Sequence, residues 1–285
     1  RMARAGVALT SCALLAFVVE VTLRLCAPVH LVGFPAAYEY DAELGVRVKA
    51  GLHALRTTDH QQELRVNRLG TVNFQEDFSG YRHRLFALGD SYTQGTGLPA
   101  DAAYPFQLDL LLNRDSTGRY HKRVAVINLG LAANGGEQSL LIFHRFSEKL
   151  GRPDMVLYLG AENDASDDAM FLRGDRHRHL TEGNPRWGVT LPAMRWAAET
   201  EIGKRLRLAL NQRRVVPSRN ATSPSGPSVA EQQRSVFERL KAQCRDVNAT
   251  LVVSWAAAPS ASYDWLKAWA ATNDVGFADW LPWVE

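Results

Sequence analysis

Ser91 stands in a sequence context that could make it a nucleophile. It belongs to Gly89-Asp90-Ser91, which follows the apolar run 84–88 and precedes a helix-like segment at 104–113. Gly89 permits a sharp exit from a buried strand, so we expect the Ser91 hydroxyl at the carboxyl edge of a sheet. The backbone N–H of Ser91 would point into the same crevice. This pattern predicts attack by a serine on an acyl carbonyl.

Two further β-type runs end in glycine or polar residues. Residues 123–129 lead to Gly130, and residues 154–159 lead to Gly160-Ala161-Glu162-Asn163-Asp164. Attack on an acyl carbonyl generates an oxyanion, and the loss of one preorganised donor to it typically costs on the order of 3 kcal/mol. Backbone N–H groups and amides at neighbouring strand ends could supply such donors.

In their order and context these residues resemble the SGNH hydrolases, also called GDSL-type esterases, and in particular a membrane-anchored bacterial subgroup. The resemblance implies that Ser91 is the nucleophile. It also implies that the N–H groups of Ser91 and Gly130 and the side-chain amide of Asn163 form the oxyanion hole, with Asp90 and Asp164 as supporting residues. The third motif departs from the family's Gly-x-Asn-Asp by one extra residue.

The histidine that serves as the base in this family lies in an Asp-x-x-His element after the last strand. No aspartate in this chain stands three residues before a histidine. Residues 275–285 resemble the last strand and the loop toward that element, so we expect the catalytic histidine beyond Glu285. A non-catalytic relative is the alternative. His177 and His179 could serve as a replacement base or in a metal site, but their arginine-rich surroundings favour a solvated loop.

β-type and helix-type runs alternate from residue 84 onward. This alternation predicts a three-layer α/β/α fold with a flavodoxin-like parallel sheet. We expect this domain to span 84–285, with an insertion at 165–228. The expected strands are 84–88, 123–129, 154–159, 250–255 and 275–279, and the expected helices are 104–113, 138–149, 194–214, 230–248 and 263–273.

Residues 28–83 form a lead-in segment of turns and short strands. Its Glu43-Leu44-Gly45 and Asn67-x-x-Gly70 pieces resemble the same membrane-anchored subgroup. We expect the segment to extend the edge of the sheet rather than to form an independent domain.

Residues 1–27 are predicted to be a membrane anchor. The apolar run 7–26 is interrupted only by Glu20 and Arg24 and is preceded by Arg1 and Arg4. About 20 apolar residues fit one transmembrane helix. The positive charge in front places the domain on the periplasmic or extracellular side. The alternatives are an amphipathic helix buried against the domain and a lipoprotein attached through Cys12.

Composition fits one globular enzyme domain on an anchor. The 285 residues are 46% hydrophobic and carry a formal net charge of +3, which does not indicate a nucleic-acid partner. Cys12, Cys26 and Cys244 do not suggest a disulfide framework, and no phosphate loop or zinc pattern occurs, so we expect no cofactor or metal.

The leading hypothesis is a serine esterase or deacetylase that acts on acyl esters, including O-acetylated glycans, through an acyl-serine intermediate. An O-acyltransferase for cell-surface polysaccharide and a non-catalytic glycan-binding or assembly protein are the alternatives. Nothing in the sequence names the acyl group.

Overall fold

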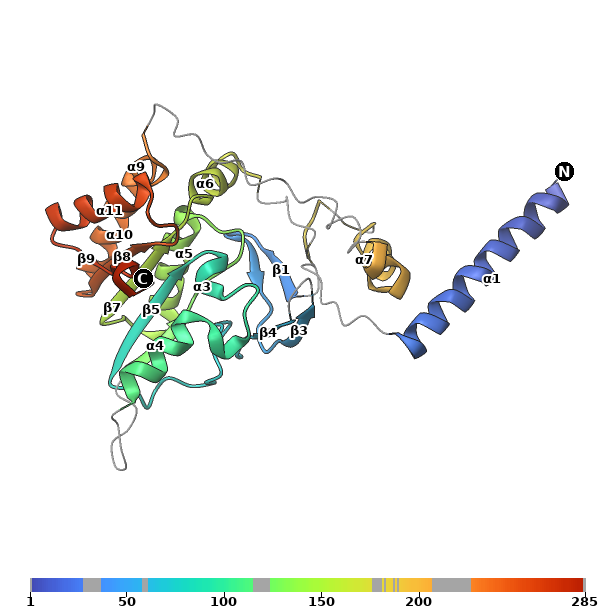
Figure 1. Cartoon of the computed structure of the whole chain (residues 1–285), viewed down its shortest axis with the longest axis horizontal. Coiled ribbons are helices and arrows are strands. Elements are labelled where there is room, and N and C mark those ends of the chain that lie inside the picture. The colour runs from blue at the N-terminus through green and yellow to red at the C-terminus, as the bar shows by residue number, and fades with distance from the viewer. Residues whose placement is uncertain are drawn as a thin grey trace.

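A five-stranded parallel sheet forms the centre of the protein (Figure 1). The computed structural model describes residues 2–27, 37–57, 61–114, 124–175, 181, 183–186, 188, 190–206 and 227–283. The strand order is β6-β5-β7-β8-β9. The strands are β5 (His83–Gly89), β6 (Val124–Asn128), β7 (Met155–Gly160), β8 (Thr250–Trp255) and β9 (Gly276–Phe277). This parallel sheet with its flanking helices confirms the predicted α/β fold.

The sheet is buried on both faces because its strands are almost continuously apolar. One face carries the larger core, which includes Phe86, Ile127 and Tyr158. The other face carries Leu85, Ala87 and Val126, against which α4 packs. The main helices around the sheet are α4 (Tyr104–Asn113), α5 (Gly136–Leu150), α10 (Arg234–Asp246) and α11 (Ala261–Thr272).

Further helical segments lie between and after these elements. They are α3 (Ser91–Gln94), η1 (Ala100–Ala102), α6 (Asp164–Leu172), α7 (Thr190–Glu199), α9 (Val229–Gln232) and η2 (Leu281–Trp283). The helix expected at 230–248 is therefore two helices, divided at Gln233. The helix expected at 194–214 is also divided, because α7 ends at Glu199 and a second helical segment covers 201–206. The remainder of that prediction lies outside the described residues.

The described strands of the lead-in segment do not extend the five-stranded sheet as expected. They form two separate antiparallel pairs, β1 (Tyr38–Asp41) with β2 (Gly45–Val48), and β3 (His53–Thr57) with β4 (Gln61–Arg65).

The outer edge of β6 is already hydrogen-bonded to the loop 72–73, which explains why no lead-in strand pairs there. Val72 donates its N–H to the Asn128 carbonyl, and the Asn73 side chain bonds to Val126 and Asn128. Buried residues of β1 and β2 nevertheless join the larger core, so the segment packs as part of the domain.

The N-terminal helix α1 (Met2–Cys26) is apolar and stands apart from the sheet (Figure 1). Its segment Gly6–Cys26 has a mean hydropathy of 2.0 and none of its hydrophobic window is buried. The alternative of an amphipathic helix buried against the domain is therefore wrong. A helix of this length and composition fits a membrane anchor or a signal sequence.

Candidate active site

Ser91 is the first residue of α3, directly after the central strand β5. Gly89 makes the turn with φ +147°, and a Cβ there would lie 2.6 Å from the Leu159 carbonyl oxygen. A side chain at position 89 is thus excluded both by conformation and by space. The turn leaves Ser91 half-buried, with its Oγ 3.3 Å from Oδ2 of Asp90.

Asp90 is a buried carboxylate that organises the start of α3. Its Oδ1 accepts a hydrogen bond from the Tyr92 backbone N–H at 2.9 Å, so Asp90 is the N-cap of the helix. Burial raises the pKa of Asp90, and hydrogen bonds from Tyr92, the Asn163 side chain and Ser91 partly oppose that rise. Asp90 thereby joins the nucleophile to the loop that follows β7.

Asn163 lies at the carboxyl end of the neighbouring strand β7 and its side chain reaches Asp90. Its Nδ2 also donates to Oδ2 of Asp167 at 2.9 Å. The residue is exposed at the surface, so a ligand at this sheet edge could reach the amide. The structure therefore brings Ser91, Asp90 and Asn163 together.

The side chains of Glu162 and Asp164, on either side of Asn163, form hydrogen bonds with other partners. Glu162 accepts a hydrogen bond from Nε1 of Trp255 at 2.9 Å, on the strand β8 side of the loop. Asp164 is buried and accepts hydrogen bonds from the Tyr158 hydroxyl at 2.7 Å and from the Ala161 N–H at 3.1 Å. Glu162 is thus turned toward β8, whereas Asn163 is on the Asp90 side of the loop.

Asp164 supports the loop from inside the protein. Burial raises its pKa well above the usual range, and the nearby carboxylates of Asp90 and Asp168 add to the rise. A protonated Asp164 could donate to a neighbouring acceptor, which an ionised carboxylate could not. Its bonds fix the turn from which α6 starts.

Gly130 lets the loop after β6 lie against the start of α3. A Cβ at this position would lie 2.3 Å from the Gln94 nitrogen and 2.6 Å from the Thr93 carbonyl carbon. Its N–H donates to Oδ1 of Asn128 at 3.0 Å. As an oxyanion donor, Gly130 would have to exchange this internal bond for the ligand.

Asn134 is a residue that the sequence analysis did not single out. Asn134 belongs to the loop 131–135. This loop begins beside the end of β5, where the Leu131 N–H donates to the Gly89 carbonyl at 3.1 Å. The loop ends at Gly135, where an added Cβ would lie 2.2 Å from Asp168 Oδ1. Both polar atoms of the buried Asn134 side chain are without a partner among the described residues. The glycine-rich turn that follows Gly130 was the available sequence signal for a loop of this kind.

No histidine in the described part of the chain is placed at this sheet edge. His83 begins β5 at the end opposite to Ser91, and its ring lies 3.3 Å from Asp154. His144 is exposed on α5 beside Glu148, and His53 begins β3. His177 and His179 lie outside the described residues, as do Arg1 and Glu285. The structure does not identify a base for Ser91 among the residues it describes.

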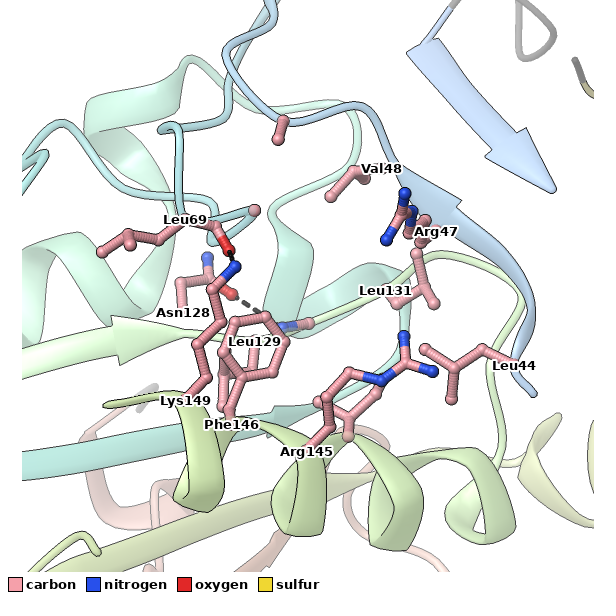
Figure 2. Close-up of a pocket in the computed structure, with 14 residues that line it drawn as sticks. Leu44, Arg47, Val48, Leu69, Asn128, Leu129, Leu131, Arg145, Phe146 and Lys149 are labelled. Carbon is pink, nitrogen blue, oxygen red and sulfur yellow. Dashed lines mark hydrogen bonds between the residues drawn. The ribbon is translucent and has the colours of Figure 1, made fainter. Parts of the chain in front are cut away.

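A separate cavity of about 130 Å³ adjoins Gly130 (Figure 2). Its lining combines apolar side chains of β2 and α5 with the cationic Arg47, Arg145 and Lys149. Arg145 is paired with Asp41 at 2.8 Å, and Lys149 donates to the Leu69 carbonyl at 2.7 Å. None of residues 89–95 lines this cavity, although Gly130 does, so it borders the candidate site without opening onto Ser91.

The described residues contain no group of three or more His, Cys, Asp or Glu side chains arranged to hold a metal ion. At the sheet edge the described residues present a hydroxyl, a carboxylate and amide donors.

Neither a protein-family model nor a curated protein matches the chain. Among solved structures, the chain is similar to one described as a "putative lipolytic protein of G-D-S-L family" from Desulfitobacterium hafniense. The two share 12% sequence identity over 70% of this chain and 77% of that chain, with a TM-score of 0.37. The fold assignment rests on the strand order and parallel pairing of this chain's own sheet.

Proposed function

We propose that this protein is a serine esterase or deacetylase that uses Ser91 as its nucleophile. The observation that carries the proposal is the position of the Ser91 hydroxyl at the carboxyl end of β5, beside Asp90 and the Asn163 amide. Open α/β sheets bind ligands at this edge. The substrate class is an acyl ester, with O-acetylated glycans as the leading candidates.

The reaction proceeds in two steps. The Ser91 oxygen forms a bond to the acyl carbon and transfers its proton to a base, and the ester's alcohol leaves with a proton. Water then attacks the acyl-serine, which releases the carboxylic acid and restores the Ser91 hydroxyl. A serine hydroxyl is a weak nucleophile unless a base removes its proton, so we expect a histidine outside the described residues to serve this role.

The oxyanion of each tetrahedral intermediate is held by the Ser91 N–H and the Asn163 amide, with Gly130 N–H as the third donor. The first two lie at adjacent strand ends and both approach Asp90. In the free protein the Asn163 amide donates to Asp167, so substrate binding would redistribute this bond.

The N-terminal helix α1 is the basis for the proposed location of the Ser91 site. We propose that α1 is retained as a single-pass anchor and that the domain lies on the periplasmic or extracellular side. The apolar length of Gly6–Cys26 and the arginines in front of it support this topology.

The test is hydrolysis of a chromogenic acetyl ester by the full chain and by Ser91→Ala. We expect the substitution to abolish turnover and to prevent covalent labelling of the protein by a fluorophosphonate probe, with unchanged thermal unfolding. Ser166→Ala is the matched control, because Ser166 is exposed three residues after Asn163 and donates only to the Asn163 carbonyl at 2.8 Å. Turnover retained by folded Ser91→Ala would exclude the acyl-serine mechanism.

A non-catalytic glycan-binding protein with the same fold is the second candidate. It is favoured by the internal bond of the Gly130 N–H and by the position of the described histidines away from Ser91. Binding of an acetylated oligosaccharide without turnover or fluorophosphonate labelling of Ser91 would support this candidate over the esterase.

A further inference from the structure

The insertion and the N-terminal helix meet at Glu20. The Glu20 carboxylate accepts hydrogen bonds from the backbone N–H groups of Glu201 and Ile202 at 2.9 and 3.1 Å. It also pairs with Arg24 at 2.6 Å. Arg205 donates a further hydrogen bond to the carbonyl of Ala27, just after α1 ends. The 200–206 segment is therefore held against the C-terminal part of α1.

This contact offsets the cost of placing the Glu20 carboxylate within the apolar helix α1. Glu20 stands six residues before the end of Gly6–Cys26, roughly 9 Å along the helix at 1.5 Å per residue. A carboxylate at that depth is costly unless it is paired and hydrogen-bonded. Arg24 supplies a counter-charge, and the 200–206 segment supplies two N–H donors. The segment must therefore run from the depth of Glu20 to the boundary between hydrocarbon and headgroups, where Arg205 contacts the carbonyl just after α1.

The 200–206 segment has one charged side and one apolar side. Glu201 is buried and pairs with Lys204 and Arg205 at 2.8 Å each. Ile202 and Leu206 are four residues apart, so they share the other side of the helix, and Leu206 is 59% exposed.

The preceding helix α7 adds two more exposed apolar side chains, Met194 and Trp196, and Trp196 is 72% exposed. Figure 1 shows α7 between the α/β domain and the C-terminal end of α1. Tryptophan has a preference for the membrane–water interface. Met194 and Trp196 are two residues apart and therefore lie on different sides of α7, so only one of them can share a surface with Ile202 and Leu206. Trp196, Ile202 and Leu206 are called the apolar face of the insertion.

We propose that the apolar face of the insertion rests in the lipid bilayer, at the headgroup boundary beside α1. The occupant is lipid because the face adjoins the only apolar helix of membrane-spanning length in the described part of the chain, and is fixed to it through Glu20. The domain would thus have two membrane contacts, one spanning and one interfacial. This inference rests on the proposed membrane anchor.

The experiment places an environment-sensitive fluorophore on the full chain in phosphatidylcholine vesicles. Ala197→Cys carries the label beside the apolar face, and Ala268→Cys on α11 is the matched control, since both alanines are exposed on helices. Cys12 and Cys26 are replaced by serine. Cys244 is buried and its thiol pKa is raised to about 12, so it does not react under native conditions.

We expect doxyl-labelled lipid to quench the label at position 197 several-fold more than the label at 268. Glu20→Leu keeps α1 apolar and removes the acceptor for the 200–206 segment, so it should abolish the quenching at 197. A label at Leu14→Cys should stay quenched in both backgrounds, because it reports the anchor alone.

Quenching at position 14 without quenching at 197 would overturn the interfacial contact and leave the anchor standing. Shielding of 197 from aqueous iodide without lipid quenching would mean that a second copy covers the face, and would also overturn the proposal. Absence of quenching at position 14 would refute the anchor, and the interfacial contact with it.

Discussion

Asp90 links the residues that the proposed reaction requires. Its buried carboxylate caps α3 through the Tyr92 N–H, accepts from the Ser91 hydroxyl and lies close enough to the Asn163 amide for that amide to lower its pKa. Burying a carboxylate is unfavourable without such donors, so the position of each donor is constrained by the others. This network fixes the spacing between the nucleophile and the amide.

Asn163→Ala should lower kcat by about 100- to 1,000-fold with little change in KM, because the amide would bind the transition-state oxyanion more tightly than the ground-state carbonyl. The substitution also removes donors to Asp90 and Asp167, so thermal unfolding must be measured alongside the kinetics. Nearly normal kcat, with a severe loss in Asp164→Ala or Glu162→Ala instead, would require a different oxyanion hole.

Gly130→Ala should destabilise the protein and reduce activity. The added Cβ would lie 2.3 Å from the Gln94 nitrogen, and backbone atoms cannot move aside without displacing α3. We expect the free energy of unfolding to fall by about 1–3 kcal/mol, which is typical of overpacking. Gly80→Ala is the control, since a Cβ at Gly80 has nothing within 4 Å. Equal denaturant midpoints for the two variants would contradict the assigned packing.

At the scale of elements, Asp168 joins three helices behind the site. It lies on α6, its Oδ1 accepts from the Glu137 N–H of α5 at 2.8 Å, and its Oδ2 accepts from Nε2 of Gln233, between α9 and α10, at 2.7 Å. Oε1 of Gln233 is buried without a partner in the described structure. Burial raises the Asp168 pKa to about 6.

Asp168 should make stability depend on pH. Its folded-state pKa of about 6 exceeds the ordinary value of 3.8, so the folded protein holds a proton that the unfolded chain releases between these values. The contribution of Asp168 to the free energy of unfolding is therefore fully present below about pH 4. It falls by on the order of 3 kcal/mol as the pH rises through 6.

Asp168→Asn should raise the melting temperature at pH 8 and flatten its decline between pH 4 and 6. The uncharged amide still accepts from Glu137, and a flipped Gln233 amide could pair its free Oε1 with the new NH₂ group. Thermal melts of both proteins across this pH range provide the measurement. A lower melting temperature of the variant at pH 8 would show that the carboxylate stabilises the helices as an anion.

Most elements of the sheet were predictable because their apolar runs and glycine ends are local features. β5, β7 and β8 agree with the expected strands within one or two residues. The lead-in pairing was not predictable, because the loop at Asn73 takes the hydrogen bonds at the edge of β6 through contacts more than fifty residues away in sequence.

The candidate site, too, was predictable where its features are local in sequence and not where they depend on packing between elements. The order Ser91, Gly130, Asn163 along the strand ends followed from sequence. The turning of Glu162 toward Trp255, the internal bond of the Gly130 N–H and the unpartnered Asn134 depend on packing between elements.

At the scale of the whole molecule, an apolar helix precedes an α/β domain, and described segments of the predicted insertion contact both. α6 begins the insertion beside Asn163, and the 200–206 segment reaches Glu20 of the anchor. One described segment of this region is thus next to the Ser91 site, and another contacts the apolar helix.

The orientation of the chain in the membrane is the last prediction. The arginines before the apolar span Gly6–Cys26 should stay on the cytoplasmic side, which places the domain on the opposite side. Leu111→Cys, at a 63% exposed position on α4, should react with a membrane-impermeant maleimide in intact spheroplasts. Cys12 and Cys26 are replaced by serine for this experiment, and the unsubstituted Leu111 background is the control. Labelling that appears only after lysis would place the domain in the cytoplasm, where extracellular glycans are not available to Ser91.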